Sequence, residues 1–120
     1  MRYILSLEEL GQFALAVFGL YYQPVQPAWW LWIILFFSPD ISMLGYLVNT
    51  RTGACCYNLF HHKAIAIMLA AAGYFLANHG LLLTGILLFG HSSFDRVMGY
   101  GLKYEDDFKH THLGWLQGKK

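Results

Sequence analysis

Apolar residues gather in four blocks along the 120-residue chain, at 5–22, 28–48, 58–77 and 81–100. Each block is about 18 to 21 residues long, and at about 1.5 Å per residue a helix of that length crosses a hydrocarbon core of about 30 Å. The pattern predicts an all-α polytopic membrane protein, a bundle of four transmembrane helices forming a single domain over 1–120. The polar segment 101–120 is predicted to be a cytoplasmic tail that folds as a C-terminal flap.

The composition supports burial in lipid, because 57% of the residues are hydrophobic and only 12% are charged. A water-soluble domain of this size leaves too large a fraction of its surface exposed to hide so many apolar side chains. The first block contains Glu8 and Glu9, and no small-residue cleavage site follows it, so it is interpreted as a mature helix rather than a signal peptide.

The basic residues predict the orientation. If the four helices alternate in direction, all eight Lys and Arg lie on one side, and the connections at 23–27 and 78–80 contain none. The positive-inside rule then places both termini in the cytoplasm, as in a multi-pass protein of the bacterial inner (cytoplasmic) membrane. The expected partner is the lipid bilayer, and no motif for nucleic-acid binding is present.

Ionisable residues fall at one depth in the predicted bundle. Measured from the outer end of each helix, Glu9, Asp40, His62, His91 and Asp95 lie roughly 15 to 23 Å deep. A charged group that faces lipid costs at least about 2.5 to 3.5 kcal/mol, so these side chains are expected to face the bundle interior. All four helices therefore contribute to one polar layer near the cytoplasmic side.

The spacing of polar residues within the helices sharpens this expectation. Asn58, His61 and His62 sit at positions i, i+3 and i+4, and His91 and Asp95 sit at i and i+4. Residues at these spacings share a helix face. The sequence therefore predicts one shared polar site at the cytoplasmic side.

A metal centre is the first interpretation of that site, because imidazoles and carboxylates together suit a divalent zinc, iron or manganese ion. Carboxylates that do not bind the ion directly would orient the ligands. The expected ligands are Asp40, His61, His62, His91 and Asp95, with His110 and His112 as less favoured additions.

Two metal-free interpretations stay open. In a catalytic or binding pocket, Asp40 or Asp95 serves as base or hydrogen-bond acceptor, His91 as acid or base, and Arg96 holds an anionic group. In a structural network, one of the two aspartates pairs with Arg96 and the histidines reach towards water.

Two further features concern the helices themselves. Pro39 has no N–H to donate to the carbonyl of Leu35, which predicts a kink in the second helix. The third helix carries a ridge of small residues that permits close helix contact, either inside the chain or in a homodimer. This ridge consists of Ala66, Ala70, Gly73 and Ala77.

Three motifs carry a resemblance to a known family. They are Phe-Ser-Pro-Asp-Ile-Ser at 37–42, Asn-x-x-His-His at 58–62, and a stretch at 90–104 that begins Gly-His-Ser-Ser-Phe-Asp-Arg. With 108–114, they resemble the bacterial membrane family catalogued as domain of unknown function 4260, over nearly the whole chain. The resemblance implies a compact multi-helix membrane domain and implies no activity.

The function expected from these patterns is that of a membrane-embedded enzyme with a His/Asp site at the cytoplasmic side. It would act, with or without a metal, on a small lipid-soluble or lipid-linked substrate. Two alternatives remain: a proton-coupled carrier or transporter subunit, in which the acids and histidines change protonation, and a structural or accessory membrane protein.

Overall fold

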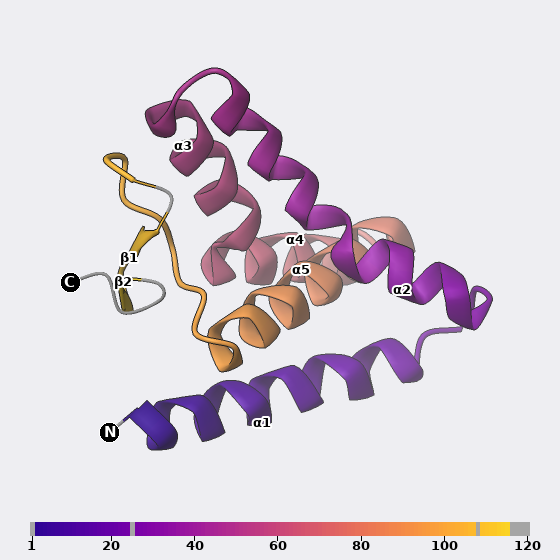
Figure 1. Ribbon diagram of the computed structural model, residues 1–120. Coiled ribbons are helices and arrows are strands. Elements are labelled where there is room, and N and C mark those ends of the chain that lie inside the picture. The colour runs from indigo at the N-terminus through magenta and orange to yellow at the C-terminus, as the bar shows by residue number, and fades with distance from the viewer. Residues whose placement is uncertain (1, 25, 108, 116–120) are drawn as a thin grey trace.

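The computed structural model describes residues 2–24, 26–107 and 109–115, and most of the chain is helical (Figure 1). The prediction of a helical protein is confirmed, with a short antiparallel hairpin added near the C-terminus. The elements in chain order are α1 (Arg2–Tyr21), α2 (Trp29–Phe37), the 3-10 helix η1 (Ser38–Leu47), α3 (Thr50–His61), α4 (Lys63–Phe75), α5 (His79–Val97), β1 (His110–Thr111) and β2 (Gly114–Trp115).

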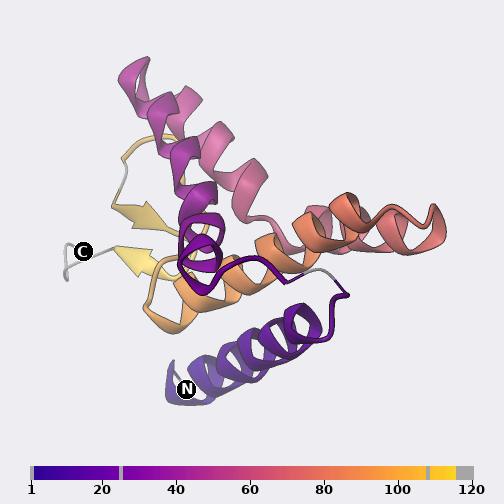
Figure 2. The same ribbon diagram turned by 90° about the vertical axis from the view of Figure 1, so that its right-hand side faces the viewer.

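Helix α5 is the central element, and α1 runs antiparallel along one side of it (Figures 1 and 2). The rings of Phe13 and Phe94 lie 5.5 Å apart between centroids. Two turns further along α1, Gly19 lies against Ile86, where an added Cβ would be 3.6 Å from the side chain. Residue numbers rise along α1 as they fall along α5, so the two helices are antiparallel.

Helix α4 packs antiparallel on another side of α5 through its small residues. A Cβ added to Gly85 would lie 2.3 Å from the backbone nitrogen of Ala70, and one added to Gly73 would lie 2.2 Å from that of Leu82. Ala66 is also buried. Ala66, Ala70 and Gly73 of the predicted ridge therefore pack against α5, whereas Ala77 lies beyond the end of α4 and is exposed.

The helix predicted over 58–77 is corrected to two shorter helices that meet at His62. This residue is extended (φ −89°, ψ 118°), and its Nδ1 accepts the N–H of Ala64 at 3.2 Å, so it caps α4. Helix α3 begins earlier than the hydrophobic block, because Oδ1 of Asn49 accepts the N–H of Thr52 at 2.7 Å and caps it. Helix α4 has 13 residues and spans only about 20 Å.

The irregularity predicted at Pro39 takes the form of a change of helix type. Helix α2 ends at Phe37, and the chain continues as η1 from Ser38. The hydroxyl of Ser38 donates to the carbonyl of Leu35 at 2.7 Å, which supplies a donor where the proline has none.

Two helical stretches within the described residues, Tyr3–Tyr21 and Trp29–Leu47, are long and apolar enough to cross a membrane. Only 11% of each lies buried inside the fold, whereas the core helix of a soluble protein is mostly buried. Their exposed side chains form much of a large apolar surface, of the kind that marks contact with lipid or a partner.

Helices α4 and α5 end in the same type of cap with different residues. Beyond α4, the N–H of Asn78 donates to the carbonyl of Gly73 at 2.8 Å, and Ala77 adopts the left-handed conformation with φ 53°. The equivalent position after α5 is Gly99, with φ 93°. Glycine is favoured at this position because it has no Cβ, so Ala77 carries local strain.

Replacing Ala77 with glycine is expected to stabilise the protein by about 0.5 to 1 kcal/mol, because the relieved strain exceeds the entropy that glycine adds to the unfolded chain. Thermal unfolding in detergent measures the change. The matched control is Ala71→Gly, at an exposed position inside α4, which should destabilise the protein by a similar amount. Effects of the same sign at both positions would contradict the argument.

Candidate metal centre

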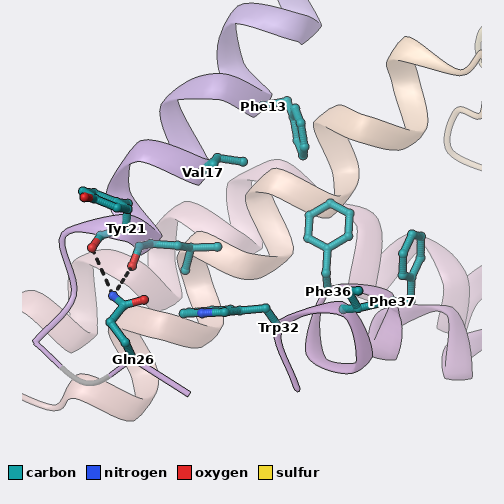
Figure 3. A pocket seen from close by; sticks show the side chains of 9 residues that line it. Phe13, Val17, Tyr21, Gln26, Trp32, Phe36 and Phe37 are labelled. Atoms are coloured by element: carbon teal, nitrogen blue, oxygen red, sulfur yellow. Dashed lines mark hydrogen bonds between the residues drawn. The ribbon is translucent and has the colours of Figure 1, made fainter. Parts of the chain in front are cut away.

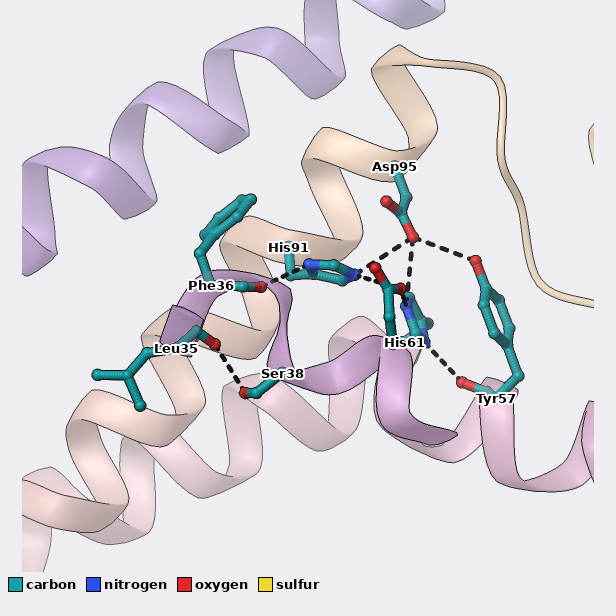
Figure 4. A network of polar contacts seen from close by, with 8 residues as sticks. Leu35, Phe36, Ser38, Tyr57, His61, His91 and Asp95 are labelled. Atoms are coloured by element: carbon teal, nitrogen blue, oxygen red, sulfur yellow. Dashed lines mark hydrogen bonds and ion pairs between the residues drawn. The ribbon is translucent and has the colours of Figure 1, made fainter. Parts of the chain in front are cut away.

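Four ionisable side chains meet between η1, α3 and α5 (Figure 4). Asp40 belongs to the first turn of η1, and His61 is the last residue of α3. His91 and Asp95 lie one turn apart on α5 and face the same side. The end of α3 at His61 and the start of η1 beside Pro39 thus place their side chains over the C-terminal half of the central helix.

The four groups alternate, so each imidazole faces both carboxylates. Nε2 of His91 lies 3.1 Å from Oδ1 of Asp40 and 3.4 Å from Oδ2 of Asp95. Nε2 of His61 lies 3.5 Å and 3.2 Å from the same two oxygens. One ligand atom from each residue lies within 4.8 Å of every other.

Backbone carbonyls orient both imidazole rings. Nδ1 of His61 lies 2.8 Å from the carbonyl oxygen of Tyr57, and Nδ1 of His91 lies 2.7 Å from that of Phe36. A carbonyl only accepts hydrogen bonds, so each Nδ1 carries the proton. In the neutral rings, both Nε2 lone pairs therefore point at carboxylate oxygens, and either a metal ion between these atoms or a proton on each Nε2 would stabilise the arrangement.

The burial of the site makes that requirement stronger. The side chain of His91 is 0% exposed, His61 is also buried, and the partners of His61 Nε2 are the two carboxylates. Buried polar atoms without a partner are costly, and buried charges need compensation. Asp40 is 41% exposed, so the site opens to its surroundings on that side.

The ligand atoms fit a divalent transition metal. At metal–ligand distances of about 2.0 to 2.1 Å, tetrahedral geometry places neighbouring ligand atoms about 3.3 to 3.5 Å apart. The four nitrogen–oxygen distances, 3.1 to 3.5 Å, come close to this spacing. The four ligand atoms all lie within 4.8 Å of one another, so a tetrahedral ion would draw the more widely separated pair together. Two imidazoles with two carboxylates suit zinc, iron(II) or manganese(II).

The structure brings together Asp40, His61, His91 and Asp95, and among the described side chains it leaves His62, Arg96 and His112 outside the cluster. His62 is exposed and caps α4. The spacing of His62 from Asn58 is compatible with a shared helix face, but the helix ends at His61. The predicted pairing of Arg96 with Asp40 or Asp95 is corrected, because the ion-pair partner of this guanidinium is Glu9.

Of the two tail histidines, only His112 has a described side chain, and it lies outside the cluster. Nδ1 of His112 accepts the N–H of Leu102 at 2.8 Å, which ties two segments of the tail together. Burial and then the positive charge of Arg96 lower the pKa of the His112 imidazole. The His110 side chain lies outside the part of the chain that the structure describes.

Tyr57 is a site residue that the sequence interpretation missed. Its hydroxyl donates to Oδ2 of Asp95 at 3.1 Å, and its ring stacks on His61 with 3.8 Å between centroids. The signal was present, since Tyr57 precedes His61 by four residues. Nζ of Lys103 lies 4.8 Å from the centroid of the Tyr57 ring. Burial lowers the pKa of Lys103 to about 8, although the charge of Asp95 opposes the shift.

The tail is attached to α3 beside this cluster through Asn58. Oδ1 of Asn58 accepts the N–H of Lys103 at 2.6 Å, and Nδ2 donates to the Lys103 carbonyl at 2.8 Å. Lys103 also pairs with the buried Thr111 in an antiparallel bridge. The polar tail therefore packs on the helices next to Tyr57.

Replacing Asn58 with alanine is expected to weaken the attachment of the tail by about 1 to 3 kcal/mol, because both backbone groups of Lys103 lose their partner. Amide hydrogen exchange at Lys103 should accelerate by about 10-fold or more. The control is Asn78→Ala, which removes the α5 cap at Leu81 and should leave exchange at Lys103 unchanged. Unchanged exchange in Asn58→Ala would contradict this role.

These features define a helical protein with two helices apolar enough to cross a membrane and a His/Asp cluster able to hold a metal ion. Residues 2–116 match the family model described as Domain of unknown function (DUF4260), and the chain belongs to this family. No curated protein and no solved structure matches the chain. The predicted family is thus confirmed, and the function has to be argued from the site.

Proposed function

We propose that this chain is a membrane-embedded metalloenzyme whose divalent ion is held by Asp40, His61, His91 and Asp95. The orientation of the two imidazoles carries the proposal, because both Nδ1 atoms face backbone carbonyls and both Nε2 atoms face the two carboxylates (Figure 4). Two neutral imidazoles and two carboxylates carry two negative charges, which one divalent cation neutralises. Outer partners that orient histidine ligands in this way are typical of metal sites.

The proposed location is the cytoplasmic membrane, with the four apolar segments in the bilayer and both termini in the cytoplasm. Support comes from the two long apolar helices and from the basic residues. In both ribbon views, the turns that follow α1 and α4 lie away from the two termini (Figures 1 and 2). In this proposal, α1 and the combined α2–η1 segment cross the bilayer, and α4 and α5 form a helical hairpin within it.

The proposed substrate is small and lipid-soluble or lipid-linked. A cavity of about 340 Å³ between α1 and α2 has an almost entirely apolar lining that includes Phe13, Trp32 and Phe36 (Figure 3). The ring of Phe36 lies 5.4 Å from that of His91, and its carbonyl oxygen orients the imidazole. An apolar molecule in this cavity would share a wall with the metal centre.

Each residue of the centre has a role that follows from its contacts. When bound, a divalent ion polarises a carbonyl or phosphoryl oxygen or lowers the pKa of a coordinated water. The carbonyl partners hold His61 and His91 in one tautomer, and the Tyr57 hydroxyl holds Oδ2 of Asp95. Asp40 is the most exposed of the four ligands, so water or a substrate atom reaches the site beside it.

Elemental analysis by mass spectrometry tests the proposal on protein purified without added metal or chelator. We expect about one zinc, iron or manganese per chain in the wild-type protein. His61→Asn should lose the metal, whereas His62→Asn should keep it, because the exposed His62 only caps α4 and asparagine is a good capping residue. The two variants make the same change at neighbouring positions.

A wild-type protein without stoichiometric metal, even after incubation with zinc, iron(II) and manganese(II), would contradict the metalloenzyme. The cluster would then have zero net charge without a metal, because each imidazole would carry a second proton and pair with a carboxylate. Equal metal loss in both variants would assign the ion to another part of the chain.

A further inference from the structure

A second polar cluster lies between α1, α4 and α5, on a different face of α5 from the metal centre. Nζ of Lys63 donates to Oε2 of Glu9 and, at 2.5 Å, to Oε1 of Gln12. Nη1 of Arg96 lies 4.0 Å from Oε1 of Glu9. The side chains of Lys63, Glu9 and Arg96 are all more than four-fifths buried.

The cluster has an excess of positive charge, because two cations share the single carboxylate of Glu9. The neighbouring Glu8 is exposed, so solvent screens its carboxylate. Among the described residues, the ion-pair partner of the Arg96 guanidinium is Glu9, and the 4.0 Å between Nη1 and Oε1 is longer than a hydrogen bond. A guanidinium that is only 17% exposed and has five N–H donors needs an acceptor. Its planar fork matches the oxygens of a phosphate.

An apolar groove of about 400 Å³ adjoins this cluster and runs between α1 and α4 over α5. Its lining includes Ala16, two turns after Glu9 on α1, and Ala66, one turn after Lys63 on α4. Phe89 of α5 forms part of its lining, and the centroid of its ring lies 5.4 Å from Nζ of Lys63. The groove therefore has a positively charged end and an apolar length.

We propose that this groove binds an amphiphile with an anionic phosphate headgroup. Arg96 and Lys63 hold the phosphate, and the groove between α1 and α4 holds the hydrocarbon chain. The excess positive charge at one end of the apolar groove favours a lipid with an anionic headgroup and a hydrocarbon chain. Arg96 is next to Asp95 in the chain. Lys63 lies two residues after His61. The proposed headgroup site therefore uses residues adjacent in sequence to two of the metal ligands. The site itself does not require the metal.

Isothermal titration of the full chain in a neutral detergent tests this site with three probes. Dioctanoyl phosphatidic acid is expected to bind at about one per chain. Dioctanoylglycerol, which has the same chains without the phosphate, and inorganic phosphate, which has no chains, should each bind at least about 10-fold more weakly. Equal affinity of the diglyceride would overturn the role of the cations, and equal affinity of inorganic phosphate would overturn the role of the groove.

Variants test the two ends of the site separately. Arg96→Gln should weaken phosphatidic acid binding by about 10-fold or more. The matched control, Arg51→Gln, removes the same charge from a side chain that is 83% exposed and pairs with Glu105, and should leave binding unchanged. Ala71→Leu fills the groove at an exposed position of its lining and should weaken binding without a change of charge.

Equal weakening by Arg96→Gln and Arg51→Gln would show non-specific attraction and overturn the proposal. Unchanged binding in both Arg96→Gln and Ala71→Leu would do the same. Phosphatidic acid binding should persist in His61→Asn, which lacks a metal ligand. A failure of the metal centre is therefore distinguishable from a failure of this site.

Discussion

Replacing His91 with asparagine is expected to lower the metal affinity of the protein by about 100-fold or more. Loss of an outer partner of a ligand already costs about 10- to 100-fold, and this change removes a ligand itself. Asparagine still offers an N–H to the carbonyl of Phe36, which accepts from Nδ1 at 2.7 Å in the wild type. The variant therefore removes Nε2 while keeping a donor for this buried carbonyl. Competition with a chromogenic chelator measures the affinity.

The same variant should lose the stabilisation that metal binding provides. An ion present at about 100 to 1,000 times its dissociation constant stabilises the folded state by about 3 to 4 kcal/mol. Chelation should lower the unfolding temperature of the wild type and leave that of His91→Asn unchanged. His79→Asn makes the same change at an exposed position of α5 and should behave as the wild type. Wild-type affinity in His91→Asn would remove His91 from the ligand set.

Replacing Gly85 with leucine is expected to prevent the helices from assembling, at a cost of more than about 4 kcal/mol. A Cβ at this position would lie 2.3 Å from the backbone nitrogen of Ala70 and 2.6 Å from the carbonyl oxygen of Ala66. Both atoms belong to the backbone of α4, so no side-chain rotation relieves the clash. Monodisperse yield in detergent and thermal unfolding measure the effect.

The matched control is Gly11→Leu on α1, where an added Cβ meets nothing within 4 Å. This variant should fold with near-wild-type stability, although it adds the same side chain. Because His91 and Asp95 lie on α5 beyond Gly85, separation of α5 from α4 should also abolish metal binding. A well-folded Gly85→Leu protein would contradict the close packing of these two helices.

The position of each polar residue along its helix could be predicted from the sequence. The direction in which its side chain points around the helix could be predicted only in part. Depth depends on counting residues from a helix end, which needs no knowledge of neighbours. Asp40, His91 and Asp95 meet as the depth argument expected. Glu9 lies at a similar depth but faces Lys63 and forms the second cluster, because its angle on α1 points it elsewhere.

The choice between His61 and His62 shows what local spacing leaves undecided. Both residues were compatible with a shared face while the segment was expected to be one helix. The structure ends α3 at His61, and the extended conformation of His62 turns its side chain to the cap of α4. A cap depends on how the two helices meet, which the hydrophobic pattern does not record.

Arg96 is a second case, because its position next to Asp95 favoured a pairing between them. Successive residues of an α-helix point about 100° apart, so the two side chains leave α5 on different faces. Asp95 faces the metal centre, whereas Arg96 faces Glu9 on α1. Only the placement of α1 beside α5 supplies that partner.

The sequence by itself determined that this protein is helical, that much of its surface is apolar, and that its basic residues avoid two of its connections. These properties follow from composition and from distances along the chain. The tertiary structure decided that η1, α3 and α5 surround one His/Asp cluster and that a separate cationic cluster adjoins an apolar groove. The physical reason is that helix breaks, caps and the rotation of each helix depend on contacts between segments far apart in the chain.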